Sequence, residues 1–311
     1  MPNPLVSICI PTYKQTDYLQ KCLQSVLTQD FKDYELIISD DTPDDSIEQF
    51  IKPILNGTKY KYYRNNPALG SPQNWNHAIS KATGKYIKLL HHDDVFTQVD
   101  SLSLMVEKME KEQSVFLFCQ TDVWYTKSDL HRIQSVSPKQ LELIKKQPEF
   151  LFFKNVIGAP SAVMHINNPS IQYDVNLKWL VDVDFYIQQL KQCKCSFIAQ
   201  PLVSTAHDVE GQITGSVQDD KNIQIKEHVL LFNKLKANRK AFADFFDYLF
   251  LQYHVSSFKE LISIVPEASV NASFFEAVIK GLPLNRKWKA FKKRFFESRY
   301  NNYMFKLEQF K

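Results

Sequence analysis

The first half of the chain alternates short, β-branched apolar runs with amphipathic helical segments, and this alternation constrains the fold more than any other feature. Between the first two runs, residues 17–29 place apolar side chains at the i, i+3, i+4, i+7 and i+8 spacing of a helix with one buried face. Strands that alternate with such helices are typical of βαβ units. We therefore expect an α/β fold with a mainly parallel central sheet flanked by helices. The predicted strands are residues 6–10, 35–39, 61–63, 86–90 and 116–121.

The pattern changes in the second half of the chain. Residues 128–180 are less regular, residues 182–192 predict a helix, and residues 197–203 predict a late strand. From about residue 221 onward the pattern is mostly helical, after an interruption by Gly, Ser and Asp residues between 215 and 220. We therefore expect an α/β domain at residues 1–218 and a helical C-terminal region at residues 219–311.

Targeting signals, apolar runs and cysteines indicate the cellular location of the protein. The first residues lack a basic head and a cleavage site, and no apolar run reaches the roughly 18 residues of a membrane span. The five cysteines are odd in number, form no CxxC pair and mostly have apolar neighbours, which indicates buried thiols in a reducing compartment. We therefore expect a cytoplasmic protein.

Two pairs of carboxylates follow two of the predicted strands. Asp40-Asp41 comes directly after residues 35–39, and Asp93-Asp94 comes after residues 86–90. In open α/β sheets ligands bind at the carboxyl ends of the strands. Adjacent acids repel each other unless a cation or a hydrogen-bond donor neutralises them, so the two pairs predict a nucleotide and a metal at one sheet edge. A Ser71-Pro72 helix start and a helix stop at Gly84 would bring the chain back into the strand that carries the second pair.

Three segments, taken in order, resemble the successive signatures of family 2 glycosyltransferases: residues 6–13, residues 34–41 and residues 84–94. The resemblance covers roughly residues 5 to 215. It implies the GT-A fold, a nucleotide-binding α/β domain with a metal-binding acidic motif, and a bacterial surface-polysaccharide setting. It also implies an inverting, non-processive transfer of a sugar from a nucleotide-diphosphate donor, with a UDP-sugar expected, to a hydroxyl of a glycan or lipid-linked glycan.

The resemblance assigns the nucleotide-binding residues. Pro11, Thr12 and Tyr13 would surround the nucleobase, with Tyr13 as the stacking residue, and Asp41 would accept a hydrogen bond from the base. Asp93 would face the ribose. A core aromatic at a strand end is the alternative for Tyr13, and a turn residue is the alternative for Asp41.

The resemblance also assigns the metal ligands. Asp94 would bind a divalent cation, Mn²⁺ or Mg²⁺, which bridges the donor phosphates. The family usually has an Asp where this chain has His91 or His92, so the motif departs from a strict DxD. His207 would approach the metal or diphosphate as an imidazole ligand, with an exposed loop histidine as the alternative.

The catalytic base falls at the start of the helix predicted for residues 182–192. Asp182 matches the base of the family, which removes the proton from the acceptor hydroxyl, and Val181 replaces the usual Glu before it. Simple capping of the helix N-terminus is the alternative for Asp182 and Asp184.

The segment 285–311 interleaves aromatic residues with nine Lys or Arg against two Glu, in a chain whose net charge is +4. It predicts peripheral contact with the anionic inner face of the cell membrane, and packing of the aromatics on the domain is the alternative. No nucleic-acid partner is expected, because no binding motif accompanies the basic segment.

Two alternative functions are considered. A nucleotidyltransferase would use the same acids, but the Gly-rich loop typical of that class is absent after the first predicted strand. A catalytically degenerate nucleotide-sugar-binding or scaffold protein of the same fold stays open.

Overall fold

The computed structural model describes residues 3–192, 194–212, 215, 217–235 and 239–282. The described residues form two compact units. The first contains the described residues of 3–137, 155–176 and 181–212, and the second contains those of 138–154, 177–180 and 215–282. The predicted membrane-contacting segment 285–311 lies outside the described residues.

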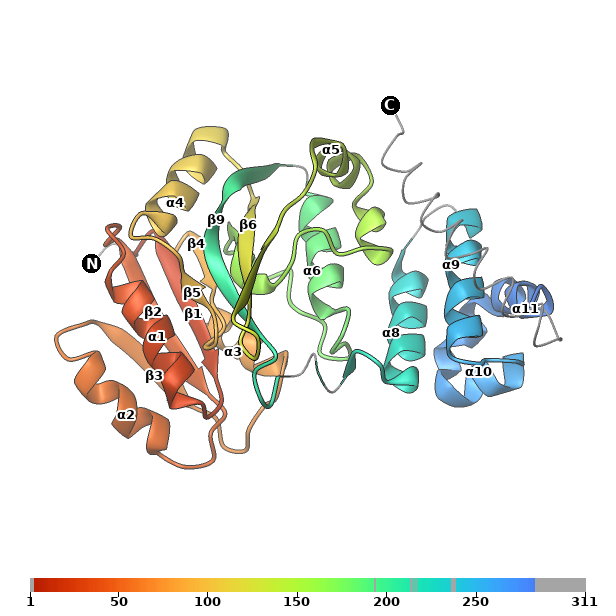
Figure 1. Ribbon diagram of the computed structural model, residues 1–311, viewed down its shortest axis with the longest axis horizontal. Coiled ribbons are helices and arrows are strands. Elements are labelled where there is room, and N and C mark those ends of the chain that lie inside the picture. The colour runs from red at the N-terminus through yellow and green to blue at the C-terminus, as the bar shows by residue number, and fades with distance from the viewer. Residues whose placement is uncertain (1–2, 193, 213–214, 216, 236–238, 283–311) are drawn as a thin grey trace. The chain divides into compact units, whose positions relative to one another are not determined.

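The first unit is built on one sheet whose first four strands are parallel. They are β3 (Tyr60–Arg64), β2 (Tyr34–Asp40), β1 (Val6–Thr12) and β4 (Tyr86–Leu89), in that spatial order. Helices α1 (Thr16–Leu27), α2 (Ser46–Ile54) and α4 (Ser101–Glu112) share one hydrophobic core with this sheet, and Figure 1 shows α1 and α2 in front of it. The predicted α/β fold is therefore confirmed.

The remaining strands make the sheet mixed. β8 (Val163–Ile166) runs antiparallel between β4 and β6 (Phe116–Tyr125), and β6 pairs in parallel with β9 (Cys195–His207). β5 (Val95–Phe96) and β7 (Leu130–Gln134) add antiparallel pairs to β9 and β6. The parallel arrangement predicted from the first half thus holds for β1 to β4, and the less regular segment after residue 128 supplies the antiparallel strands β7 and β8.

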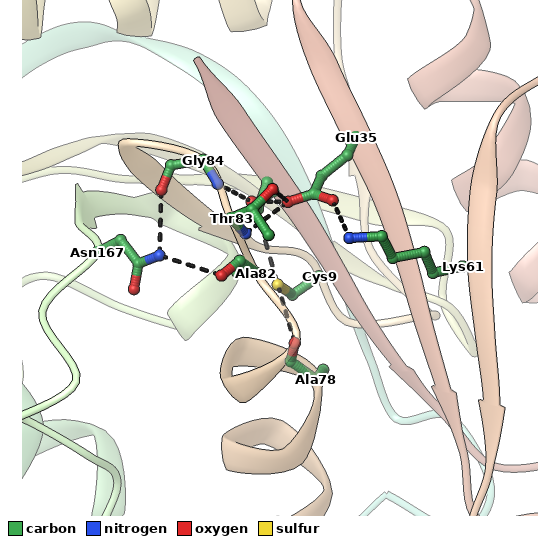
Figure 2. Close-up of polar contacts among 9 residues, drawn as sticks. Cys9, Glu35, Lys61, Ala78, Ala82, Thr83, Gly84 and Asn167 are labelled. Atoms are coloured by element: carbon green, nitrogen blue, oxygen red, sulfur yellow. Dashed lines mark hydrogen bonds and ion pairs between the residues drawn. The ribbon is translucent and has the colours of Figure 1, made fainter. Parts of the chain in front are cut away.

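Helix α3 (Gln73–Ser80) begins and ends differently from the sequence prediction. Its N-cap is Pro72 and no side chain caps it, so Ser71 is not the cap. Gly84 lies beyond the helix end and packs against β1, where a Cβ atom would come within 2.8 Å of the Ser7 nitrogen. The Gly84 nitrogen donates to Ser7 Oγ at 2.9 Å (Figure 2). The glycine is therefore needed for close approach to the sheet rather than for a helix stop.

Glu35 on β2 collects the polar contacts around this close approach (Figure 2). Its carboxylate accepts hydrogen bonds from Ser7 Oγ at 2.7 Å, from the Thr83 nitrogen at 2.6 Å and from Lys61 Nζ at 2.7 Å. Partial burial alone would raise the pKa of Glu35, but these hydrogen bonds lower the pKa to about 2. Glu35 thereby links β1, β3 and the turn before β4. These contacts lie at the strand ends opposite to those that carry the paired acids.

The second unit is helical and has an aromatic core. Its elements are α5 (Pro138–Lys146), η1 (Pro148–Phe152), α8 (Lys221–Lys234), α9 (Arg239–Gln252), α10 (Phe258–Ile264), η3 (Pro266–Asn271) and α11 (Ala272–Lys280). Phe152, Phe232, Phe242 and Phe246 pack with ring centroids 4.7 to 6.1 Å apart. Glu227 on α8 accepts hydrogen bonds from the backbone nitrogens of residues 178–180, which fixes that short segment in this unit. No helix in the described part of the chain is long and apolar enough to cross a bilayer.

Candidate active site

The carboxyl ends of β1 and β2 meet in the sheet, as the register pairs Thr12 with Asp40. Pro11 and Thr12 are buried, whereas the Tyr13 side chain is 49% exposed and has Lys14 Nζ 4.9 Å above its ring. Tyr13 is therefore not the core aromatic that one interpretation of the sequence allowed. Its exposed ring stands at the strand end where the resemblance places the nucleobase.

Asp41 is buried and its carboxylate is engaged. It accepts hydrogen bonds from Asn65 Nδ2 at 2.9 Å, from the Leu69 nitrogen at 3.0 Å and from the Gly70 nitrogen at 2.8 Å. These three donors come from the segment that leads into α3, so Asp41 fixes that segment against the end of β2. A hydrogen bond from Asp41 to a nucleobase stays a prediction.

The second acid pair forms a cluster with a histidine at the end of β4. One ligand atom from each of His91, Asp93 and Asp94 lies within 4.8 Å of the others. Asp94 is buried, and it accepts a hydrogen bond from the Ala206 nitrogen at 3.1 Å and another from the Ser161 hydroxyl. Asp93 accepts a hydrogen bond from Gln212 Nε2 at 2.7 Å. Burial and the charge of Asp93 raise the pKa of Asp94 well above its ordinary value.

His91 contributes a largely buried imidazole to this cluster, with 19% of its side chain exposed. Its Nδ1 is 4.0 Å from Asp94 Oδ2, and its Nε2 is buried without a hydrogen-bond partner among the described residues. Burial lowers the pKa of His91 to about 4, so the ring is neutral near pH 7. His92 is placed differently, because its Nε2 donates to Gln15 Oε1 at 3.0 Å.

This donor set fits a divalent cation. Two carboxylates and a neutral imidazole supply hard oxygen ligands and one nitrogen ligand, and the pair of acids gains most from a positive charge. The raised pKa of Asp94 indicates that protein groups alone do not offset the charge of the acid pair. The residues present therefore fit the metal that the resemblance implies.

His207 is not a member of this cluster. Its ring packs against Tyr125 with centroids 5.3 Å apart, and its carbonyl accepts hydrogen bonds from Thr126. The neighbouring Ala206 nitrogen, rather than the His207 ring, contacts Asp94. The assignment of His207 as a metal ligand stays a prediction.

Asp182 lies in the first turn of α6 (Val181–Leu190) and is half-buried. Its Oδ1 accepts from the Val183 nitrogen at 2.8 Å, and its Oδ2 accepts from Asn155 Nδ2 at 2.8 Å. Asn155 Oδ1 in turn accepts from the Ile157 and Gly158 nitrogens, both at 3.0 Å. Asp182 thus combines a helix-start contact with a side-chain bond that fixes the direction of its second oxygen.

Asn155 and Lys88 contact the candidate site residues but were not predicted from the sequence. Asn155 was missed because a lone Asn in an irregular segment is ordinary turn chemistry. Lys88 lies inside an apolar strand motif, and its fully buried ammonium donates to the Ser161 carbonyl. Burial lowers the pKa of Lys88 to about 8. A charged residue within such a run was the available signal.

The segment 155–162 joins the two halves of the site. Asn155 at one end bonds Asp182, and Ser161 at the other end bonds Asp94 and accepts from the His91 nitrogen at 2.9 Å. An aromatic bridge gives a second connection: Trp75 packs on His91 with centroids 4.6 Å apart and on Tyr173 at 5.2 Å. The charge of Asp182 in turn raises the pKa of buried Tyr173, after the larger effect of burial itself. Residues 155–162 therefore connect the acidic cluster with Asp182.

A sheet of this topology, with side chains that could hold a metal ion at the end of one strand, is typical of the GT-A type of glycosyltransferase domain. The glycosyl transferase family 2 model matches residues 7–165, about half of the chain. The chain therefore belongs to glycosyl transferase family 2.

Individual proteins resemble the chain in sequence or in fold. The GalNAc(5)-diNAcBac-PP-undecaprenol beta-1,3-glucosyltransferase of Campylobacter jejuni is 30% identical over 118 residues, which span 37% of this chain and 38% of that protein. Staphylococcus aureus TarS in complex with UDP-GlcNAc has a TM-score of 0.61 at 15% identity, covering 96% of this chain and 91% of the other. The Pyrobaculum calidifontis mannosyltransferase PcManGT, in complex with GDP-Man and Mn²⁺, has a TM-score of 0.53 at 11% identity, covering 96% and 86%. At these identities the two structures show the shared fold.

Proposed function

We propose that this glycosyltransferase moves a sugar from a nucleoside diphosphate donor, a UDP-sugar, to a hydroxyl of a glycan or lipid-linked glycan, with inversion at the anomeric carbon. The observation that carries the proposal is the connection of the His91, Asp93 and Asp94 cluster to Asp182 through residues 155–162. An acidic cluster beside one separate, oriented carboxylate supplies the two functions that single-displacement transfer needs.

A divalent cation held by Asp94, with Asp93 beside it, would offset the negative charge that develops on the departing diphosphate. Tyr13 would stack on the base, and Asp93 would also face the ribose. Asp182 would accept the proton of the acceptor hydroxyl as its oxygen attacks the anomeric carbon, on the face opposite to the leaving group. The bond from Asn155 fixes the direction of the Asp182 carboxylate that would receive that proton.

The named relatives support the substrate classes. UDP-GlcNAc in the TarS complex and GDP-Man with Mn²⁺ in the PcManGT complex are nucleoside diphosphate sugars on the same fold. The Campylobacter relative is named for a polyprenyl diphosphate-linked acceptor. A UDP donor and a lipid-linked acceptor are therefore the first choices for assay.

The first experiment is calorimetric titration with UDP, GDP, CDP and dTDP, each with and without Mn²⁺. We expect one diphosphate to bind in a metal-dependent way, and we expect Asp94→Ala to abolish that binding. Asp17→Ala, which removes an exposed acid from α1, is the matched control and should bind as the wild type does.

The opposite result would favour a different protein class. If none of the four diphosphates binds with any metal, the degenerate-scaffold alternative gains, and protein or membrane partners become the next search. If a nucleotide binds but no sugar is transferred to any glycan acceptor, the chain is a nucleotide-sugar-binding protein of the same fold.

A further inference from the structure

Just before the acid pair Asp93-Asp94, this chain has His91 or His92 where the family usually has an Asp. His91 is followed by His92, and the sequence alone does not distinguish which of the two belongs to the site. The structure separates them, since His91 lies in the cluster with Asp93 and Asp94 whereas the ring of His92 is bonded to Gln15.

We propose that His91 is a ligand of the divalent cation and that its imidazole biases the site toward Mn²⁺ or Co²⁺ and away from Mg²⁺. This inference rests on the proposed function, because it concerns the cation of the same donor site. It goes further by assigning a nitrogen ligand and a metal preference.

The distances permit a shared ion. Mg²⁺ and first-row cations of similar size lie about 2.0 to 2.2 Å from their ligands, so two ligands of one ion are at most about 4.4 Å apart. His91 Nδ1 and Asp94 Oδ2 are 4.0 Å apart, which is within that limit. Asp93 completes a set whose members lie within 4.8 Å, so a side-chain shift of under about 1 Å brings all three atoms around one ion.

The surroundings of His91 hold its ring in place. Trp75 packs on the imidazole at a centroid distance of 4.6 Å, and the His91 backbone nitrogen donates to Ser161 Oγ. The Ser161 hydroxyl also donates to the Asp94 carboxylate, so one hydroxyl contacts both the His91 backbone and Asp94. Metal-ligating side chains are commonly oriented by such outer partners. For the His91 ring the outer partner is Trp75, and the ring so held has Nδ1 4.0 Å from Asp94 Oδ2.

Ligand chemistry gives the metal preference. Mg²⁺ strongly favours oxygen ligands, whereas Mn²⁺ and Co²⁺ also accept imidazole and gain affinity in that order. Replacement of an aspartate by a histidine at this position therefore penalises Mg²⁺. The reverse change, His91→Asp, should restore an all-oxygen site.

Electron spin-echo spectroscopy of bound Mn²⁺ tests the ligand directly, because a coordinated imidazole adds ¹⁴N modulation to the echo. Samples of the full chain with Mn²⁺ and UDP, GDP, CDP or dTDP are compared for the wild type, His91→Asp, His92→Asp and His207→Ala. We expect modulation in the wild type, its loss in His91→Asp, and its retention in the other two. No modulation in the wild type, or modulation that survives His91→Asp, overturns the proposal; loss in His207→Ala alone would make His207 the ligand.

Affinity measurements on the same proteins test the preference. We expect the ratio of the nucleotide affinity with Mn²⁺ to that with Mg²⁺ to fall at least about tenfold in His91→Asp. Loss of a residue that only orients a metal ligand already lowers metal affinity by about that factor. In His92→Asp the ratio should be unchanged. An unchanged ratio in His91→Asp contradicts the metal bias. The echo measurement is also made with Mn²⁺ alone, so His91 ligation is decided even if no nucleotide binds, a result that would refute the proposed function separately.

Discussion

Asn155 Nδ2 donates a 2.8 Å hydrogen bond to Asp182 Oδ2, and the same side chain accepts from the backbone nitrogens of residues 157 and 158. One amide therefore fixes both the turn that approaches the acidic cluster and the carboxylate that is proposed to act as base. Tyr186 reinforces the turn by donating from its hydroxyl to the Gly158 carbonyl at 3.0 Å. The orientation of the proposed base thus depends on the Asn155 side chain.

Asn155→Ala should lower kcat by about tenfold to a hundredfold while changing the donor Kd little, because misplacement of a catalytic group is costly in the transition state and not in donor binding. Steady-state kinetics and calorimetry on one preparation separate the two effects. Asn167→Ala is the matched control, since Asn167 also bridges loop carbonyls, those of Ala82 and Gly84, away from Asp182 (Figure 2). Equal losses of kcat in the two variants would refute a positioning role for Asn155.

Asp182→Ala should abolish transfer, with a loss of at least about a hundredfold, because general base catalysis contributes that much or more. Donor binding should persist, since the acidic cluster is intact. Asp184→Asn tests the capping alternative: Asp184 is buried on the same helix turn and bonds Gln188. If both variants lose stability and neither loses turnover per folded molecule, Asp182 is only a helix-start residue.

The hydrophobic pattern predicts the fold of the first unit well because burial decides it. Residues 17–29 and the first strands carry apolar side chains at regular spacing, and these are the residues found in the shared core. The antiparallel strands β7 and β8 were not predicted, because β7 is almost fully exposed and β8 is only four residues long. Short or exposed strands depend on their pairing partners, which a local pattern does not contain.

The site is predictable only where its residues are adjacent in the sequence. The pair Asp93-Asp94 is visible as a motif, and Asp182 is visible through its resemblance to the family. Asn155 and Ser161 act through contacts with residues 27 and 67 or more positions away, which spacing does not reveal. His91 could be noted as a departure, but its separation from His92 required the direction of each ring.

Glu35 makes a pH-dependent contribution to stability. Its pKa falls from 4.5 to about 2 in the folded chain, so the unfolded state binds more protons between these values. The contribution is complete above about pH 4.5, is lost as the pH falls toward 2, and amounts to at most about 3 kcal/mol. Glu35→Gln should lower the free energy of unfolding at pH 7 and flatten its decline in acid, as measured by urea denaturation.

The control for Glu35 is Glu48→Gln. Glu48 pairs with Lys52 on the surface of α2, where the side chains are 38% and 59% exposed. Such a pair contributes about 0.3 to 0.5 kcal/mol, so this variant should be close to the wild type. A Glu35→Gln protein as stable as Glu48→Gln would show that the hydrogen bonds around Ser7 and Thr83 add no net stability.

Lys88 should affect the free energy of unfolding at alkaline pH. Its pKa falls from 10.5 to about 8 because the ammonium is fully buried, so the unfolded state binds more protons between pH 8 and 10.5. The free energy of unfolding should therefore rise with pH in this window by up to about 3 kcal/mol from this group. The Lys88→Met protein lacks this titration, so the difference between wild type and variant should grow in favour of the wild type from pH 8 to 10.5.

Lys88 also donates to the carbonyl of Ser161, the residue that contacts His91 and Asp94. If that contact positions the acidic cluster, Lys88→Met should weaken metal-dependent nucleotide binding at pH 7 even where the protein is fully folded. Parallel urea denaturation and calorimetry distinguish the two effects. A pH-independent stability difference combined with unchanged nucleotide affinity would mean that folding does not lower the pKa of Lys88 and that Lys88 does not support the site.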